Sequence, residues 1–138
     1  MAKSIKLTIR TPEKEVFNGE VQYVKLITDG GVTKILPGHA DMIASARYSP
    51  LIFETLDRLE EDFVIRQSLI NINNSTKSVE IMAIDCVLKS EMRHQDAEEY
   101  LKFIEEELKK GKDLSEFKIK YLEEERFAVF HQIKSNKK

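Results

Sequence analysis

The chain has 138 residues, of which 41% are hydrophobic and 33% charged, with a formal net charge of −2. This length allows one ordinary domain, or a small domain with an appendage, and the near-neutral charge argues against nucleic-acid binding through a clustered basic face. No run reaches the ~18 apolar residues of a membrane span, and the first four residues lack the apolar core of a signal peptide. The single cysteine excludes an internal disulfide and suits a reducing compartment. We therefore expect a cytosolic protein that would reach a membrane only through a partner.

Residues 1–88 read as β-structure. Segments such as 5–11 and 68–74 alternate apolar and polar side chains with the period of two of half-buried strands, and the alternation is imperfect in 21–28. By composition, the first part of 51–67 could also be helical. Asn18-Gly19 predicts a tight hairpin turn that divides residues 15–21 into two short strands. Further turns are expected at Asp29-Gly30-Gly31 and Pro37-Gly38. Strands are predicted in residues 5–11, 15–21, 21–28, 32–36, 51–67 (two strands around a charged loop at 57–62), 68–74 and 78–89. Many short strands separated by turns are typical of an antiparallel sandwich or barrel.

Residues 89–138 change to a helical period, with two apolar stripes at spacings of three and four. Gly111 is placed to end the first helix, and Asp113 with Glu116 resembles a capping box that opens the second. The stripes consist of Ala97, Tyr100, Leu101, Ile104 and Leu108, and of Phe117, Tyr121, Leu122, Ala128, Val129 and Ile133. The predicted fold class is therefore α+β: an N-terminal antiparallel β-sandwich, residues 1–88, followed by a C-terminal two-helix antiparallel hairpin, residues 89–138.

His39 and Asp41 form the one neighbouring pair of a histidine and an acid in the β half. Such a pair can act as a general base or bind a metal, but both functions need further partners, and none are close in the sequence. We interpret His39 as a turn histidine whose ring bonds the nearby backbone.

The other reactive residue types do not form a recognisable site. Cys86 lies in an apolar strand, which favours a buried structural thiol over a nucleophile. Gly30-Gly31 fits neither glycine-rich phosphate-binding pattern, and no Cys-x-x-Cys or zinc-spaced cluster occurs. The acidic runs at 60–62, 105–107 and 123–125 are interpreted as solvated faces. We expect no catalytic residue, no metal and no cofactor, so the sequence favours a protein that works through contacts.

Two segments of the β half are distinctive: TPEKEVFNGEV, residues 11–21, and ILPGHADMIASA, residues 35–46, separated by a strand and the glycine turn at Gly31. In this order they resemble the epsilon subunit of bacterial F-type ATP synthase. That family typically begins TP-E-x-x-(V/F)-x-G-x-V and carries an LPGHAPLLTAL segment at the same spacing. This chain keeps LPGHA, residues 36–40, and has Asp41 where proline is usual. Over the remaining length, the resemblance lies in a β half followed by a helical hairpin.

The chain departs from the family pattern at further positions, including Val32 and Lys34 after the glycine turn, and two departures bear on function. Arg66-Gln67-Ser68 stands where Ser-Gly-Gly is usual, and side chains there are expected to alter local packing. Some family members bind ATP through an I-D-x-x-R-A segment, which here reads MRHQDA, residues 92–97, so the acid and the arginine have exchanged places. An ion pair between Arg93 and Asp96 is expected to survive the exchange, whereas a nucleotide site is not.

The resemblance implies a non-catalytic subunit of the central stalk. In this family the β-sandwich grips the gamma subunit and rests on the c-ring, thereby coupling ion-driven ring rotation to ATP synthesis. The helical hairpin folds onto the sandwich, or extends along gamma toward the alpha/beta catalytic head and impedes ATP hydrolysis. Such a subunit is peripheral, at the cytoplasmic face of the plasma membrane.

The resemblance also assigns partner-contact residues. Two turns are expected near the c-ring and two basic residues of the second helix near an acidic surface of the head; these are Asp29, Gly30, Gly31, Pro37, Gly38 and His39, and Arg126 and Lys134. Three alternatives stay open: an adaptor that binds an unrelated coiled coil, a small enzyme that uses His39 and Asp41, and an ATP sensor of the hairpin type.

Overall fold

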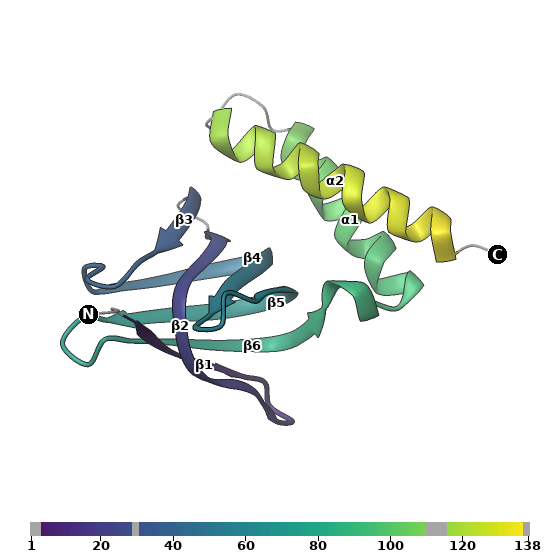
Figure 1. Ribbon diagram of the computed structural model, residues 1–138. Coiled ribbons are helices and arrows are strands. Elements are labelled where there is room, and N and C mark those ends of the chain that lie inside the picture. Colours follow the sequence, from purple (N-terminus) through teal and green to yellow (C-terminus); the bar gives the residue numbers. More distant parts are fainter. Residues whose placement is uncertain (1–3, 29–30, 110–115, 137–138) are drawn as a thin grey trace. The chain divides into compact units, whose positions relative to one another are not determined.

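The computed structural model describes residues 4–28, 31–109 and 116–136, the last range without the side chains of residues 117 and 134–136. The chain divides into two compact units, Met1–Leu88 and Lys89–Lys138. Among the described residues, the first unit contains six strands and the second contains a short 3₁₀ helix and two α-helices; the strands and α-helices are labelled in Figure 1. Their bounds are β1 Ile5–Arg10, β2 Glu15–Thr28, β3 Gly31–Ile35, β4 Met42–Thr55, β5 Glu60–Asn73, β6 Ser78–Leu88, η1 Lys89–Glu91, α1 His94–Lys109 and α2 Glu116–Asn136.

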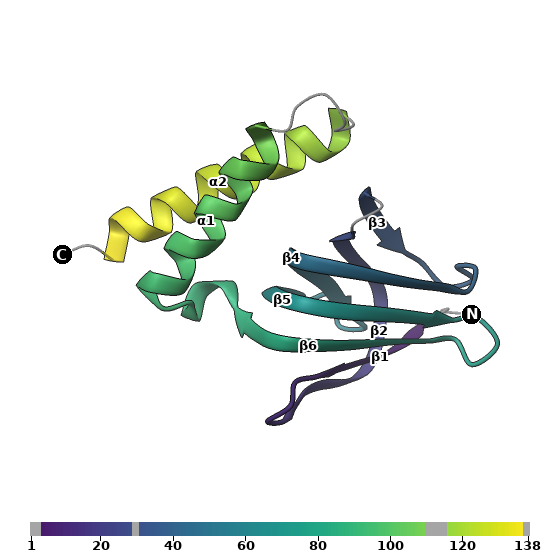
Figure 2. The same cartoon turned by 180° about the vertical axis from the view of Figure 1, so that it is seen from behind.

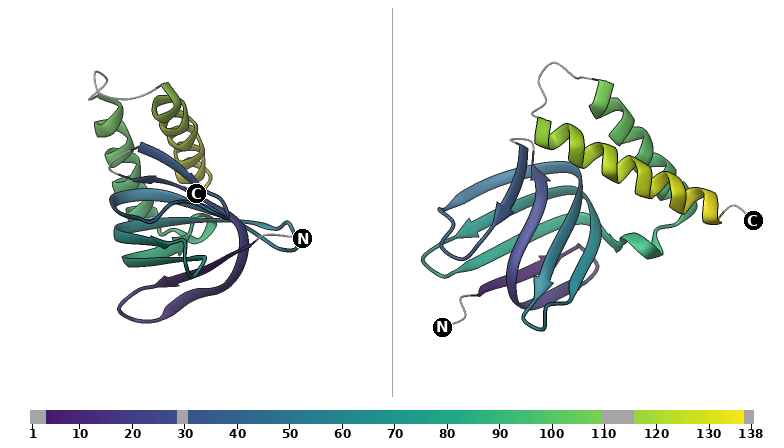
Figure 3. Two further views of the ribbon diagram at one scale, coloured as in Figure 1. Left: turned by 90° about the vertical axis from the view of Figure 1, so that its left-hand side faces the viewer. Right: turned by 45° about the horizontal axis from the view of Figure 1, so that its top comes forward.

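The six strands form one sheet in the order β1-β6-β5-β4-β2-β3, and an additional β1–β2 pairing closes it into a barrel-like sandwich. Figures 2 and 3 show the long β2 passing from β1 to β3 and β4 across the unit. All pairings are antiparallel except that of β1 with β6, which is parallel. The predicted β-sandwich is confirmed, and the parallel contact of its first and last strands was not predicted.

The predicted hairpin at Asn18-Gly19 is wrong, because β2 runs unbroken through this dipeptide. Thr8 opposes Asn18 and Leu7 opposes Gly19 across the β1–β2 ladder. Neither Asn18 nor Gly19 has the positive φ that the predicted turn type requires. The chain has already reversed at Thr11, whose amide donates to the carbonyl of Lys14 at 2.9 Å.

The core of the first unit is formed by the inward-facing residues of all six strands. In β6, Val79, Ile81 and Ala83 are buried while Glu80 and Met82 between them are exposed, which is the expected period of two. The remaining buried members of the cluster are Ile5, Leu7, Ile9, Val21, Val24, Leu26, Ile35, Ala46, Leu51, Phe53, Ile65, Ile70, Ile72 and Cys86. The core therefore lies wholly within residues 1–88.

In the second unit, α1 and α2 form the predicted helical hairpin (Figure 1). Tyr100 of α1 bonds Glu125 of α2, and Lys89 before α1 bonds Gln132 near the end of α2, so the two helices run antiparallel. Ala128, predicted in the apolar stripe, is exposed instead. Gly111 and Asp113 lie outside the described residues. Among the described helices, none is both long and apolar enough to cross a membrane.

Candidate functional site

The segment between β3 and β4, residues 36–41 and hereafter the corner, is built around a tight turn. The amide of His39 donates to the carbonyl of Leu36 at 3.1 Å. Pro37 supplies the fixed φ of the second turn position, and Gly38 adopts a φ of +92° at the third. These are the requirements of a type II turn, so the Pro-Gly dipeptide determines the shape of the corner.

The two polar side chains of the corner serve local structure and do not form a pair. His39 Nδ1 lies 2.7 Å from the carbonyl oxygen of Ala40, as expected for a turn histidine that bonds the backbone. Asp41 Oδ1 instead accepts the amide of Asn74 at 2.7 Å, in the turn between β5 and β6. A general base oriented by the neighbouring carboxylate is therefore not assembled here.

The β5–β6 turn is held on both sides. The carbonyl of Lys77 accepts a hydrogen bond from the amide of Lys6 in β1 at 3.0 Å. The amide of Asn74 donates to the carboxylate of Asp41 in the corner. Asn73 Oδ1 caps the turn by accepting the amides of Ser75 and Thr76. At one end of the sandwich, a side-chain bond thus joins the corner to the β5–β6 turn, and a backbone bond joins this turn to the start of β1.

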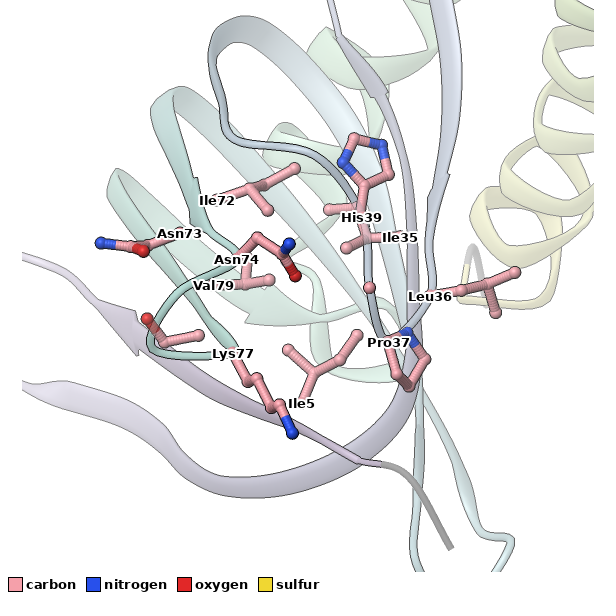
Figure 4. Close-up of a pocket in the computed structure, with 12 residues that line it drawn as sticks. Ile5, Ile35, Leu36, Pro37, His39, Ile72, Asn73, Asn74, Lys77 and Val79 are labelled. Carbon is pink, nitrogen blue, oxygen red and sulfur yellow. The ribbon is translucent and has the colours of Figure 1, made fainter.

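A shallow depression separates the corner from the β5–β6 turn (Figure 4). Its apolar floor is formed by Ile5, Ile35, Ile72 and Val79. A cavity volume of about 10 Å³ holds about one water molecule, far less than the few hundred Å³ that a small-molecule site needs. The depression is therefore too small to hold a small-molecule ligand.

The predicted contact residues occupy separate ends of β3. Gly31 begins the strand with a φ of +125°, and the corner follows the end of the strand at Ile35. A strand of five residues separates its ends by roughly 13 Å. Asp29 and Gly30 lie outside the described residues. The two predicted turns therefore do not form one continuous loop.

Two of the helical residues singled out in the sequence, Arg93 and Arg126, are exposed. Arg93 Nε and Asp96 Oδ2 form the expected ion pair at 3.0 Å, with Arg93 85% exposed. Arg126 is exposed on α2. The side chain of Lys134 lies outside the described residues.

The segment Arg66-Gln67-Ser68, where paired glycines were expected, keeps a glycine-like backbone. Gln67 has a φ of +47°, in the left-handed region. Arg66 pairs with Asp85 on the neighbouring strand, and the buried Ser68 donates to the carbonyl of Ala46 at 3.1 Å. The side chains of Arg66 and Ser68 are thus accommodated by polar contacts with neighbouring strands, on either side of Gln67 with its strained backbone.

Among the residues that the structure describes, no cluster of three or more histidine, cysteine or acidic side chains could hold a metal ion. Cys86 is buried in β6, as expected, and burial raises the pKa of its thiol to about 12. A thiol with so high a pKa is almost wholly protonated at neutral pH, which makes it a poor nucleophile.

Sequence reasoning missed the environment of one acid. The run 123–125 was interpreted as a solvated face, but Glu125 is only 5% exposed, unlike Glu123 and Glu124. Its position, three residues after Leu122 and four before Val129, places it on the apolar stripe of α2. Helical spacing could therefore have identified it.

Comparison with known proteins gives the family. A family model described as the ATP synthase delta/epsilon chain β-sandwich domain matches residues 4–89. The chain belongs to this ATP synthase delta/epsilon family. The ATP synthase epsilon chain of Clostridium novyi (strain NT) is 34% identical over 110 residues, which is 80% of this chain and 82% of that protein. The resemblance to the epsilon subunit is thereby confirmed.

Two solved structures resemble the delta/epsilon chain described here in fold. A chain of the Euglena gracilis mitochondrial ATP synthase, in a structure of OSCP/F1/c-ring, aligns with a TM-score of 0.62 at 19% identity, covering 96% of this chain and 80% of that one. A chain of the Tetrahymena thermophila mitochondrial ATP synthase, in a structure of the central stalk and c-ring, gives 0.55 at 17% identity and covers all of both chains. Both matches extend over the β-sandwich and the helical hairpin.

Proposed function

We propose that this chain is the epsilon subunit of the central stalk of a membrane ATP synthase, a non-catalytic part that couples ion-driven rotation of the c-ring to ATP synthesis in the catalytic head. The observation that carries the proposal is the family match over residues 4–89, together with an epsilon-chain relative that matches 80% of the chain. The fold neighbours come from assemblies of F1, central stalk and c-ring, which supports the gamma subunit, the c-ring and the alpha/beta head as partners.

In this role the β-sandwich, residues 1–88, transmits torque, and its turns contact the c-ring. Gly31 and the Pro37-Gly38-His39 turn are the described contact residues, with Asp29 and Gly30 beside Gly31. Torque transmission requires a contact surface that does not deform. The turn geometry of the corner and the Asp41–Asn74 bond support this requirement, because they tie the contact segment to the sheet behind it.

The helical hairpin, residues 89–138, is the regulatory part, which inhibits ATP hydrolysis when it extends along gamma to the head. Arg126, exposed on α2, and Lys134 meet an acidic surface of a catalytic subunit in that state. The chain binds no ATP of its own, because Arg93 and Asp96 are exchanged relative to the family's nucleotide motif and are paired to each other. The complex places the chain peripherally at the cytoplasmic face of the plasma membrane.

Affinity purification of the tagged chain from membranes of its own host tests the proposal. We expect the gamma, alpha and beta subunits and the c-ring to be recovered with it. A matched pair of variants then tests the corner: His39→Ala should weaken recovery of the c-ring with little effect on gamma, whereas Lys14→Ala, at an exposed turn outside the proposed contact, should affect neither. Recovery of an unrelated coiled-coil protein without any ATP synthase subunit would establish the adaptor function instead.

A further inference from the structure

A buried polar cluster joins three elements of the second unit. Glu125 of α2 is 5% exposed and Tyr100 of α1 is 1% exposed. The ammonium of Lys89, in η1, lies 2.5 Å from Glu125 Oε1, and the Tyr100 hydroxyl donates to Glu125 Oε2 at 2.8 Å. Each carboxylate oxygen therefore has its own donor, from a different segment of the chain.

The cluster is surrounded by the apolar face of the hairpin. Leu122 and Val129 flank Glu125 on α2, and both are fully or almost fully buried, while Ile104 of α1 is 0% exposed. A charge in such surroundings is costly unless it is paired and hydrogen-bonded. While the hairpin is closed, the buried carboxylate of Glu125 is therefore stable only in a packing of α2 that brings it to Lys89 and Tyr100.

A second bond connects α2 to the same junction residue. The side-chain amide of Gln132 donates to the carbonyl of Lys89 at 2.6 Å. Gln132 lies seven residues after Glu125 and thus on the same face of the helix. Lys89 is therefore held by α2 through both its side chain and its backbone, at the point where β6 has just ended.

Apolar stripes alone do not fix the register of one helix against the other. If α2 slides by one turn along α1, apolar side chains such as leucine and valine again face the partner helix. A buried polar group removes this freedom, and fixing a register is the best-attested use of such groups. We propose that Glu125 is the latch of the helical hairpin: it fixes one register of α2 against α1 and η1, and makes opening of the hairpin an all-or-none event. The regulatory consequence rests on the proposed function of the hairpin, whereas the latch itself does not.

Amide hydrogen exchange of the full chain tests the latch. Glu125→Leu leaves the part-buried Lys89 ammonium without its carboxylate, and we expect exchange of the α1 and α2 amides to rise by at least about tenfold. The triple variant Lys89→Met, Tyr100→Phe and Glu125→Leu removes both charges together with the buried hydroxyl that bonds Glu125. It should return exchange to within about threefold of the parent, since apolar replacement of a whole buried pair is often neutral. The β4 and β5 amides report whether the sandwich remains folded.

The exposed pair Arg93–Asp96 of the same unit provides the matched control. Its removal by Arg93→Met should change helix exchange by less than about twofold, because exposed pairs contribute little. The latch is overturned if Glu125→Leu exchanges like the parent, or if the triple variant exchanges as fast as Glu125→Leu alone. Tyr100→Phe should give an intermediate increase, and an unchanged rate would remove Tyr100 from the cluster.

ATP hydrolysis by the reconstituted complex separates the latch from the proposed function. If hydrogen exchange in Glu125→Leu rises and hydrolysis is altered, both are supported. If exchange rises but hydrolysis equals that of the parent complex, the latch is supported and the proposed regulatory role of the hairpin fails.

Discussion

Gly38 has a backbone conformation that only glycine adopts without strain, and its surroundings are open. Its φ is +92°, and a Cβ built there would meet no heavy atom within 4 Å. The cost of any substitution is therefore conformational and involves no steric clash with neighbours. A substitution of Gly38 should therefore change the backbone of the corner without disturbing the packing of the core.

Gly38→Ala is expected to destabilise the chain by about 1 kcal/mol, the cost of forcing an L-residue into the left-handed region. Denaturant unfolding followed by circular dichroism measures this. Gln67→Gly is the converse change, because Gln67 has a φ of +47°, and it should leave stability equal or raise it by up to about 1 kcal/mol. A loss of stability in Gln67→Gly would show that its side-chain contacts outweigh the backbone strain.

Asp41 replaces the proline of the family pattern and bonds Asn74 across the end of the sandwich. Asp41→Ala is expected to cost about 1 kcal/mol and to increase exchange of the Asn74 amide, measured by NMR. Asp41→Asn keeps an acceptor oxygen and should preserve most of the protection. Equal exchange in the parent and in Asp41→Ala would mean that the bond does not form in solution.

At the scale of elements, two strands each contain a side chain whose pKa is raised: Cys86 in β6 and Tyr23 in β2. Burial raises the pKa of Cys86 from 9.0 to about 12. Burial, with the hydrogen bond to Glu60, raises the pKa of Tyr23 from 10.0 to about 12. Both groups therefore stay protonated up to a higher pH in the folded state than in the unfolded state.

The pH dependence of stability follows from these two pKa values. Below about pH 8 both groups are protonated in either state, and their contribution to stability is fully present. Between about pH 8 and pH 12 the unfolded chain releases these protons first, so the free energy of unfolding falls. Urea titrations at several pH values measure the slope, and Tyr23→Phe should reduce it above pH 10. A Tyr23→Phe chain with the parent slope would contradict the contribution of Tyr23.

Periodicity predicted most elements because it reports burial along a single element. The alternation in residues 79–84 and the stripe of Ala97, Tyr100 and Ile104 both matched the structure. The prediction of a hairpin at Asn18-Gly19 was wrong because pairing with β1 outweighs the local turn preference of this dipeptide. Sequence spacing does not reveal that pairing. The Asp41–Asn74 bond spans 33 residues, and such contacts depend on the folded sheet.

The corner illustrates what the sequence could and could not predict about the candidate site. Pro37-Gly38 specified the turn, and the backbone bond of the His39 ring was anticipated. The cluster of Glu125 was overlooked because a run of three acids suggests solvent. Only the helical phase distinguishes Glu125 from its two exposed neighbours.

At the scale of the whole molecule, the chain consists of two units, and the core cluster of the first ends at Cys86. We expect a chain that ends after Leu88 to fold on its own, with a cooperative urea transition and the near-ultraviolet spectrum of the intact sandwich. Near-ultraviolet dichroism will follow Phe53, which stacks on Phe63 with ring centroids 5.8 Å apart. A truncated chain without a cooperative transition would show that the sandwich needs the helical unit.

The parallel contact between β1 and β6 has a consequence for the order of events during synthesis. Lys6 pairs with Ser78, and Arg10 pairs with Met82. The first strand can pair with β2 soon after synthesis, but its parallel ladder forms only once the last strand of the sandwich has been made. Until then both edges remain open to pairing with other chains. Closure joins residues more than seventy positions apart, which makes this the step that sets the folding rate of the sandwich. A nascent chain halted before residue 78 should aggregate, and one extended past residue 88 by the length of the ribosomal tunnel should be soluble.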